Sequence, residues 1–185
     1  MFGPALIGPR LTLRPPSVRD IPRFRRWLAD PEIARYWWTR DVPWAKRSAV
    51  AAVVLFIGGL RPNAILWTIT HDGEAIGHCL IRQINRTKRQ ATAAVLIGSA
   101  SDHGKGFAAE ACAIRNKFVF DRLGLDTLKA TALAENTSSR RLLEKLGYRL
   151  LASTSGGASV AGREQEILLF ELTRGDYLRQ RATEA

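Results

Sequence analysis

The stretch "SDHGKGFAAEA" (residues 101–111) places a lysine between two glycines directly before a segment with helical spacing. A glycine in regular structure costs about 0.5–1 kcal/mol relative to alanine, because its backbone loses more freedom on folding. Two glycines at a strand-to-helix junction therefore indicate that something approaches the backbone closely. The unpaired N–H groups of a helix's first turn and the helix dipole favour an anion there. The stretch predicts an anion-binding loop; a loop that only needs a flexible backbone is the alternative.

Two other phosphate-binding loops do not fit these residues. A nucleotide-hydrolase loop needs GxxxxGK followed by Ser or Thr, whereas five residues separate Gly98 from Gly104, and Lys105 is followed by a glycine. A dinucleotide-binding loop needs GxGxxG early in a βαβ unit. Here Ala109 replaces the third glycine, and an antiparallel meander precedes the loop. Neither nucleotide-binding class is therefore expected.

The segments on either side of the loop predict a mixed α/β sheet with helices on its faces. A serine cap opens a predicted helix that ends before the Asp-Pro pair at 30–31. The turn segments "HDGE" and "NRTKRQ" divide residues 63–98 into a three-stranded antiparallel meander. A glycine- and serine-rich segment is expected to join the last two strands. The expected strands are 10–16, three within 63–98, 125–134, "YRLLAS" and "EILLFEL", and the expected helices are 17–30, 44–59, 106–122 and 136–147.

The chain's charge is unusual for a soluble protein of 185 residues. It carries 28 Lys and Arg against 17 Asp and Glu, a net charge of +11. This excess points to an anionic partner such as a phosphorylated small molecule, nucleic acid or an acidic protein surface. A general preference for Arg in the source proteome explains it equally well. Nucleic acid is expected only through the basic surface, because no aromatic RNA-binding element is present.

Other features narrow the class and compartment. Cys79 and Cys112 are too few for a disulfide framework and are expected to be small buried residues. No signal peptide is recognisable, and the most apolar stretch, 49–60, is shorter than the roughly 20 residues of a membrane span. We expect one cytoplasmic domain over 1–185, with its core at about 10–173 and a C-terminal tail or short helix at 174–185, and no membrane partner. No His, Cys and Asp spacing suggests a metal.

Three motifs in order resemble the GNAT acetyltransferase superfamily. "HGKGFAAEA" resembles its pyrophosphate-binding loop, (R/Q)xxGxG or (R/Q)xxGxA, and "ENTSSRRLLEKLGYRLL" resembles its next motif, NxxSxxxLxxLGF. "LTLRPPSVRDIPRFRRWLADPEIARYW" is similar to the opening of the RimJ/RimL-like subfamily, which acetylates N-termini of ribosomal proteins. The resemblance implies a mostly antiparallel sheet of about seven strands with about four helices. It also implies that a parallel pair, 91–98 and 127–133, splays apart.

The resemblance further implies that acetyl-CoA lies in the splayed cleft. Backbone groups near Ile97 and Gly98 would pair with the pantetheine arm and supply an oxyanion donor. His103 would adjoin the phosphates, and Asn136 would cap a helix and touch CoA. The amides expected to hold the pyrophosphate are those of Gly104, Lys105, Gly106, Phe107 and Ala108.

The family's usual catalytic side chains are missing. The position of its glutamate base falls at Ala93, and that of its tyrosine acid falls at Leu143. Ser139 is a substitute that would hydrogen-bond the CoA thiolate; hydrogen bonding at a helix N-terminus is the other interpretation. Glu166 is a candidate acid or base facing the acceptor, or a solvated strand end. Ser101 stands where the loop usually opens with Arg or Gln.

The acceptor is an amine, and several kinds remain open. Trp37 and Trp38 fall in the segment that borders the acceptor pocket in the family, with Trp44 nearby. The leading hypothesis is an acetyl-CoA-dependent N-acetyltransferase of a protein or peptide N-terminus, ribosomal or other, acting as a monomer or homodimer. One alternative is acetylation of a small amine such as an aminoglycoside or polyamine, for which Asp30, Glu32 and Asp41 offer an acidic patch. The other is a catalytically weak, CoA-binding regulatory protein.

Two remaining basic or titratable features have modest expected roles. His71 and His78 flank the "DGEAIG" turn and are expected on the strand surface. The basic run "RQINRTKRQ" (82–90) is expected to be a solvated hairpin tip. A contact with the 3′-phosphate of CoA or with RNA is the functional alternative for this run.

Overall fold

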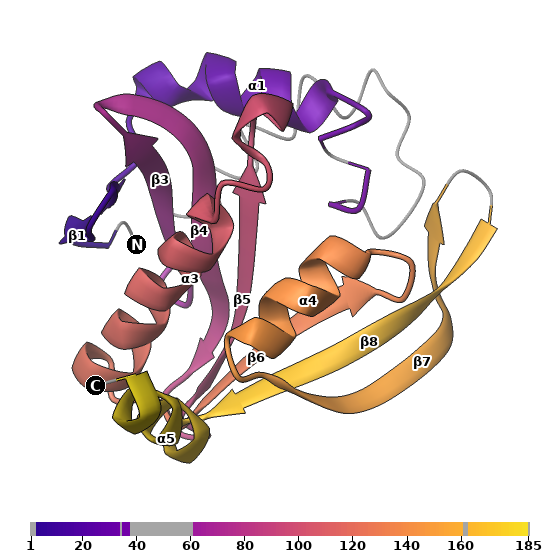
Figure 1. Ribbon diagram of the computed structural model, residues 1–185. Coiled ribbons are helices and arrows are strands. Elements are labelled where there is room, and N and C mark those ends of the chain that lie inside the picture. The colour runs from indigo at the N-terminus through magenta and orange to yellow at the C-terminus, as the bar shows by residue number, and fades with distance from the viewer. Residues whose placement is uncertain (1–2, 34, 38–60, 161–162, 185) are drawn as a thin grey trace.

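The computed structural model describes residues 3–33, 35–37, 61–160 and 163–184. Its frame is an eight-stranded sheet in the order β1-β2-β3-β4-β5-β6-β8-β7, drawn in Figure 1. All neighbouring strands are antiparallel except β5 and β6, which are parallel. The strands are β1 Leu6–Ile7, β2 Leu11–Arg14, β3 Ile65–His71, β4 Glu74–Asn85, β5 Gln90–Ile97, β6 Thr127–Leu133, β7 Arg149–Val160 and β8 Arg163–Thr173.

Helices cover both faces of this sheet. They are α1 Ile21–Ala29, α3 Phe107–Lys117, α4 Thr137–Lys145 and α5 Arg174–Glu184, with a π-helical turn at Phe118–Arg122 and 3-10 turns at Val18–Asp20 and Ala100–Asp102. The predicted fold class, a mixed and mostly antiparallel sheet flanked by helices, is confirmed. The predicted helix at 44–59 lies outside the described residues.

Alternating side chains divide the core into two clusters, because successive strand residues point to opposite faces. The main cluster lies under α3 and α4, where Phe107 and Leu143 are buried over the strands. The second lies on the opposite face, where Phe24 and Leu28 of α1 pack against Leu96 and its neighbours. The sheet therefore presents one surface toward α3 and α4 and another toward α1.

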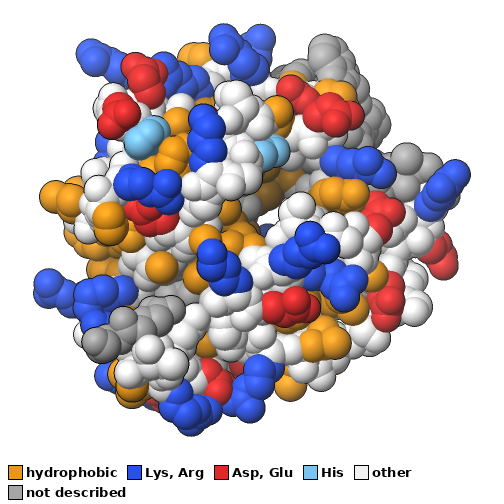
Figure 2. Space-filling model, in the orientation of Figure 1, with side chains coloured by type: hydrophobic (Ala, Val, Ile, Leu, Met, Phe, Trp, Pro, Cys, Tyr) orange, Lys and Arg blue, Asp and Glu red, His pale blue; other side chains and the backbone are white. Residues whose placement is uncertain are grey.

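The parallel pair parts soon after it begins. Pairing of β5 with β6 runs only from Gln90↔Thr127 to Thr92↔Lys129, although both strands continue beyond these residues. The predicted splay is thus present. Figure 2 shows the α3 and α4 face hollowed at its centre, between these two helices, with Lys and Arg side chains nearby on either side.

Two segments differ from the predictions. The glycine- and serine-rich segment after 154 is not a loop, because β7 continues through it to Val160 and β8 begins at Arg163. An irregularity between Thr154 and Ala158 absorbs the glycines, and Gly156 has φ 75° there. The strand β1 was not expected at all. No described helix has the length and apolar character that crossing a membrane requires.

Candidate active site

The glycine loop, defined here as residues 98–106, leads from β5 into α3. Gly104 has φ +77° and Gly106 has φ +82°, a left-handed conformation that other residues rarely adopt. A Cβ atom built on Gly104 would meet nothing within 4 Å, and one on Gly106 would meet only Nη2 of Arg10, at 3.5 Å. The glycines are thus required by backbone conformation, and the side of the loop where side chains would stand is open.

Backbone donors are left free in this loop and in the first turn of α3. The amide of His103 donates to the carbonyl of Ala100 at 3.1 Å, and that of Glu110 donates to the carbonyl of Gly106 at 3.1 Å. Between them, the amides of residues 104–109 have no acceptor among the described residues. Because unpaired N–H groups and the helix dipole both favour negative charge, this backbone is suited to a phosphate.

The charged side chains around the loop largely neutralise one another. Lys105 Nζ lies 3.0 Å from Asp102 Oδ1, and Arg10 Nε lies 2.7 Å from Glu110 Oε2. Burial alone would raise the pKa of Glu110, but hydrogen bonds from the amide and guanidinium of Arg10 outweigh it and lower that pKa. His103 is exposed, and its Nε2 lies 3.2 Å from a carbonyl at the end of β5. The groups that this loop offers to an anion are therefore chiefly backbone amides.

The end of β5 exposes backbone groups toward the gap. The amide of Gly98 already donates to the carbonyl of Ile76 on β4 at 2.7 Å. Because consecutive strand residues direct their backbone groups to opposite sides, Val95 and Ile97 direct theirs toward β6, where pairing has ended. A Cβ on Gly98 would lie 2.1 Å from the indole of Trp27. Gly98 thus serves α1 packing. Val95 joins Ile97 as a residue whose backbone groups face the gap, and the carbonyl of Ile97 also lies 3.2 Å from Nε2 of His103.

Phe107 and Ala108 begin α3 with their side chains turned away from solvent. The ring of Phe107 is buried, with its centroid 4.6 Å from that of His71 and 5.0 Å from the guanidinium carbon of Arg10. Ala108 is half-buried. Both can offer a ligand their amides rather than their side chains.

A second group of predicted residues meets where β6 ends and α4 begins. Asn136 Oδ1 accepts the amide of Ser139 at 3.0 Å, which confirms the predicted helix cap. The amide of Ala134 donates to the carbonyl of Glu166 at 2.9 Å, so β8 runs beside the same point. Ser139 is half-buried and Glu166 is exposed. The structure therefore brings Asn136, Ser139 and Glu166 together around the far end of the splay.

The α1 face holds Trp37 and an unexpected buried histidine. Trp37 is half-buried, with its ring centroid 4.7 Å from that of His78 in an edge-on contact. The prediction that His78 lies on the strand surface is wrong, because it is fully buried beneath α1. Burial lowers the pKa of His78 to about 3. Trp38 and Trp44 lie outside the described residues.

The positions of the family's usual base and acid are apolar and buried. Ala93 and Leu143 belong to the main core, at 5% and 7% exposure. Tyr148 is no substitute, because its buried hydroxyl lies 3.3 Å from Asn116 Oδ1 and 3.4 Å from Arg115 Nη2. Burial raises the pKa of Tyr148 well above its usual value. The phenol thus stays protonated inside the core.

The fully buried Arg115 was missed, since its place in the helical pattern gave no signal of function. Its Nη1 lies 3.5 Å from Cys79 Sγ, and its Nη2 lies 2.9 Å from Asn116 Oδ1. Cys79 and Cys112 are buried and unlinked, as predicted. Among the described residues no group of three or more His, Cys, Asp or Glu side chains is placed to hold a metal ion.

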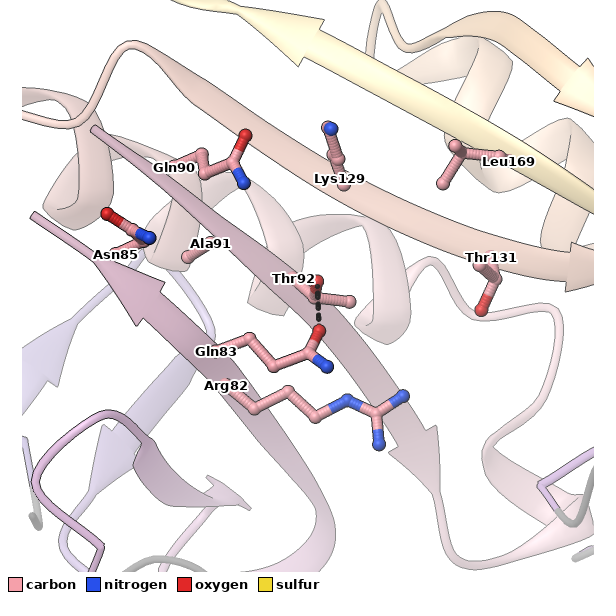
Figure 3. Close-up of a pocket in the computed structure, with 9 residues that line it drawn as sticks. All are labelled: Arg82, Gln83, Asn85, Gln90, Ala91, Thr92, Lys129, Thr131 and Leu169. Atoms are coloured by element: carbon pink, nitrogen blue, oxygen red, sulfur yellow. Dashed lines mark hydrogen bonds between the residues drawn. The ribbon is translucent and has the colours of Figure 1, made fainter. Parts of the chain in front are cut away.

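A polar pocket of about 500 Å³ opens where β5 and β6 are still paired (Figure 3). Its walls come from β4, β5, β6 and β8. Thr92 is on the strand face that also carries Ala94 and Leu96 of the second cluster, so the pocket lies on the α1 side of the sheet. Its polar lining consists of Arg82, Gln83, Asn85, Gln90, Thr92, Lys129 and Thr131. The sequence analysis did not single out this pocket.

The fold and the glycine loop together define an acyltransferase of the GNAT class. The sequence model of the acetyltransferase (GNAT) domain family matches residues 10–149. The chain therefore belongs to this family, whose acetyl donor is acetyl-CoA. A curated relative, an uncharacterized N-acetyltransferase p20 of Bacillus licheniformis, is 26% identical over 172 residues. That match covers 91% of this chain and 95% of the relative.

Two solved structures illustrate the range of similar folds. RimJ of Mycobacterium smegmatis, in complex with CoA-disulfide, has a TM-score of 0.80 and 23% identity, covering 98% of this chain and 93% of that one. Spermidine N-acetyltransferase of Vibrio cholerae, in complex with CoA and spermine, has a TM-score of 0.81 and 20% identity, covering 92% and 99%. At these identities the likeness concerns the fold, so the amine acceptor has to be argued from the site.

Proposed function

We propose that this chain transfers the acetyl group of acetyl-CoA to the N-terminal amine of a protein or peptide. The observation that carries the proposal is the run of free amides at 104–109 beside the gap between β5 and β6. In this arrangement the pyrophosphate binds the amides of the loop and of the first turn of α3. The pantetheine arm runs into the gap along the backbone groups of Val95 and Ile97.

The reaction is a direct transfer between two bound reactants. The neutral amine nitrogen attacks the thioester carbon, a C–N bond forms, and the C–S bond breaks. The nitrogen loses one proton and the sulfur gains one, so the products are an N-acetyl amine and CoA thiol. Holding the two reactants in line supplies much of the rate, since such positioning lowers a barrier by roughly 7–11 kcal/mol.

Ser139 is the residue we assign to the leaving thiolate. It lies in the first turn of α4, and its amide is already held by Asn136, which fixes the start of the helix. A hydroxyl donor beside the sulfur stabilises the developing charge. Glu166, exposed near the same end of the splay, is the carboxylate we assign to proton removal from the amine, directly or through water.

The peptide acceptor is supported by the opening segment, residues 11–37, and by the fold shared with RimJ. The second candidate acceptor is a polyamine, which the shared fold with spermidine N-acetyltransferase favours. The polar lining described for the pocket on the α1 side includes Arg82 and Lys129 but no Asp or Glu. This lining supports the peptide over a polycation.

The assignment of Ser139 is tested by release of CoA thiol from acetyl-CoA in the presence of short peptides and of spermidine. Ser139→Ala should lower kcat at least tenfold with little change in the KM for acetyl-CoA, because the lost hydrogen bond forms only as the thiolate leaves. Ser138→Ala, at the exposed neighbouring position, is the matched control and should retain the wild-type kcat. Equal kcat values for the two variants would remove Ser139 from the mechanism.

A further inference from the structure

The polar pocket at the base of the splay combines two positive charges that have no partner among the described residues. Arg82 extends from β4 and Lys129 from β6, with β5 between these strands, as Figure 3 shows. Within the described part of the chain, neither side chain makes a hydrogen bond or an ion pair. Two cations beside the glycine loop, Arg10 and Lys105, are in contrast each paired with a carboxylate. This pocket therefore brings together two cations that no described carboxylate pairs with.

The nearest acidic neighbours do not neutralise the pocket. Glu171 is the cross-strand neighbour of Lys129 on β8, but it is equally the cross-strand neighbour of Arg149 on β7. Glu171 does not line the pocket, and the described residues contain no ion pair between it and Lys129. No Asp or Glu is among the described residues that line the pocket, and apart from the two cations its polar lining offers neutral amides and hydroxyls.

The pocket lies where the gap between β5 and β6 begins, whereas Ser139 and Glu166 lie around the far end of the same gap. Thr92 and Lys129 are the last paired residues of β5 and β6, so the gap that would admit the pantetheine arm begins directly after them. Thr131, which faces the pocket from β6, is already beyond this last pair. A molecule seated in the pocket therefore borders the gap from the α1 side of the sheet.

From this juxtaposition we infer that the pocket binds a carboxylate of the acceptor, and that the preferred acceptor is a peptide with Asp or Glu close behind its N-terminal amine. The inference rests on the proposed function and narrows its substrate class. A guanidinium and an ammonium together pair well with a carboxylate, and the planar fork of Arg82 can bind both carboxylate oxygens at once.

The neutral groups of the pocket fit the same ligand. Gln83 Oε1 accepts the hydroxyl hydrogen of Thr92 at 2.9 Å, a bond marked in Figure 3, which leaves the amide N–H₂ of Gln83 as a donor. Gln90 and Asn85 add further side-chain amides to the lining. A polyamine, in contrast, would place its own positive charges beside Arg82 and Lys129, and like charges at short range repel.

The test compares three peptides that share an N-terminal serine and differ at the next two positions: Glu-Glu, Gln-Gln or Lys-Lys. Initial rates with saturating acetyl-CoA are measured for the full-length chain, for Arg82→Gln and for Lys129→Gln. Arg122→Gln is the matched control, because it removes the same charge from an exposed position outside the pocket. Spermidine is measured alongside the peptides.

We expect the wild-type protein to have the highest kcat/KM with the Glu-Glu peptide and the lowest with the Lys-Lys peptide. Arg82→Gln and Lys129→Gln should each raise the KM for the Glu-Glu peptide about fivefold to tenfold, with less than a twofold change for the Gln-Gln peptide. Arg122→Gln should change neither. Arg82→Glu should reverse the order of the charged peptides.

Three different results would overturn the inference, and they can be told apart. Acetylation of the Gln-Gln peptide with no preference for Glu-Glu, or with pocket variants that match Arg122→Gln, rejects the charged pocket and leaves the N-acetyltransferase proposal standing. Acetylation of spermidine in preference to all three peptides rejects the peptide acceptor as well. Binding of acetyl-CoA without transfer to any amine rejects both proposals.

Discussion

At His78, an imidazole is removed from water without gaining a partner. Its side chain is fully buried between Phe24 and Trp37, and neither ring nitrogen has a hydrogen-bond partner among the described residues. A buried donor or acceptor left unpaired costs about 1–3 kcal/mol. Burial also lowers the pKa of His78 to about 3, so the ring is neutral in the folded protein at every pH near neutrality.

This arrangement predicts how acid affects stability. Between pH 6.5 and about 3, His78 is protonated in the unfolded chain and neutral in the folded one, so its contribution to stability falls as the pH falls. His78→Leu removes this dependence and the unpaired nitrogens. We expect the free energy of unfolding of the variant, minus that of the wild type, to increase by about 1.4 kcal/mol for each pH unit that the pH falls below 6. Urea unfolding at pH 7.5, 6 and 5 measures it, and parallel pH dependences would contradict it.

Single residues also show what the sequence alone could predict about the site. Gly104 and Gly106 were recognisable, because only glycine adopts their left-handed backbone conformation without strain. Asn136 was recognisable as a cap for an equally local reason. Arg10 was not, because its contacts with Lys105 and Glu110 join residues about 100 positions apart and leave no local pattern. Arg82 was noticed only as part of the basic run 82–90, and Lys129 was not noticed, because their meeting depends on which strands become neighbours.

At the scale of elements, α1 is held against the end of β5 by the absence of a side chain at Gly98. A Cβ there would lie 2.1 Å from the indole of Trp27, which is nearly fully buried. Overpacking of this kind typically costs 1–3 kcal/mol. Because Gly98 opens the glycine loop, displacement of Trp27 would also disturb the start of that loop.

We therefore predict that Gly98→Ala destabilises the protein by roughly 1–3 kcal/mol in urea unfolding. Gly175→Ala is the control, because a Cβ there meets nothing nearer than 3.5 Å and the residue lies in α5. It should be neutral or slightly stabilising, as expected when alanine replaces glycine in a helix. Equal effects of the two substitutions on the free energy of unfolding would contradict the prediction, because they would mean that Trp27 can move aside without destabilising the protein.

Elements with a local signal were predicted well, and those that depend on distant pairing were not. The meander between 63 and 98 has alternating residues and clear turns, and it forms β3, β4 and β5. The predicted helix at 106–122 is α3 followed by the π-helical turn. Strand β1 has two residues and exists only because β2 pairs with it. The glycine-rich part of β7 likewise forms a strand because it pairs with β8, although its composition is typical of a turn.

At the scale of the whole molecule, the sheet separates two different surfaces that meet at the splay. On the α3 and α4 face, carboxylates pair with Lys105 of the glycine loop and with Arg10 beside it, and the loop amides have no acceptor among the described residues. On the α1 face, the polar pocket holds two cations for which the described part of the chain provides no partner. This division fits a donor entering from one face and an acceptor from the other. For ligand binding, the positions of the unpaired cations then matter more than the net charge of +11 itself.

The central claim is that the glycine loop binds acetyl-CoA, and calorimetric titration with acetyl-CoA tests it most directly. We expect micromolar binding by the wild-type protein and none by Gly106→Trp, whose indole would fill the open side of the loop. Gly124→Trp is the matched control, since Gly124 also has a positive φ, +64°, and meets nothing within 4 Å. It should bind like the wild type. Absence of binding by the wild type, or equal binding by Gly106→Trp, would contradict the claim.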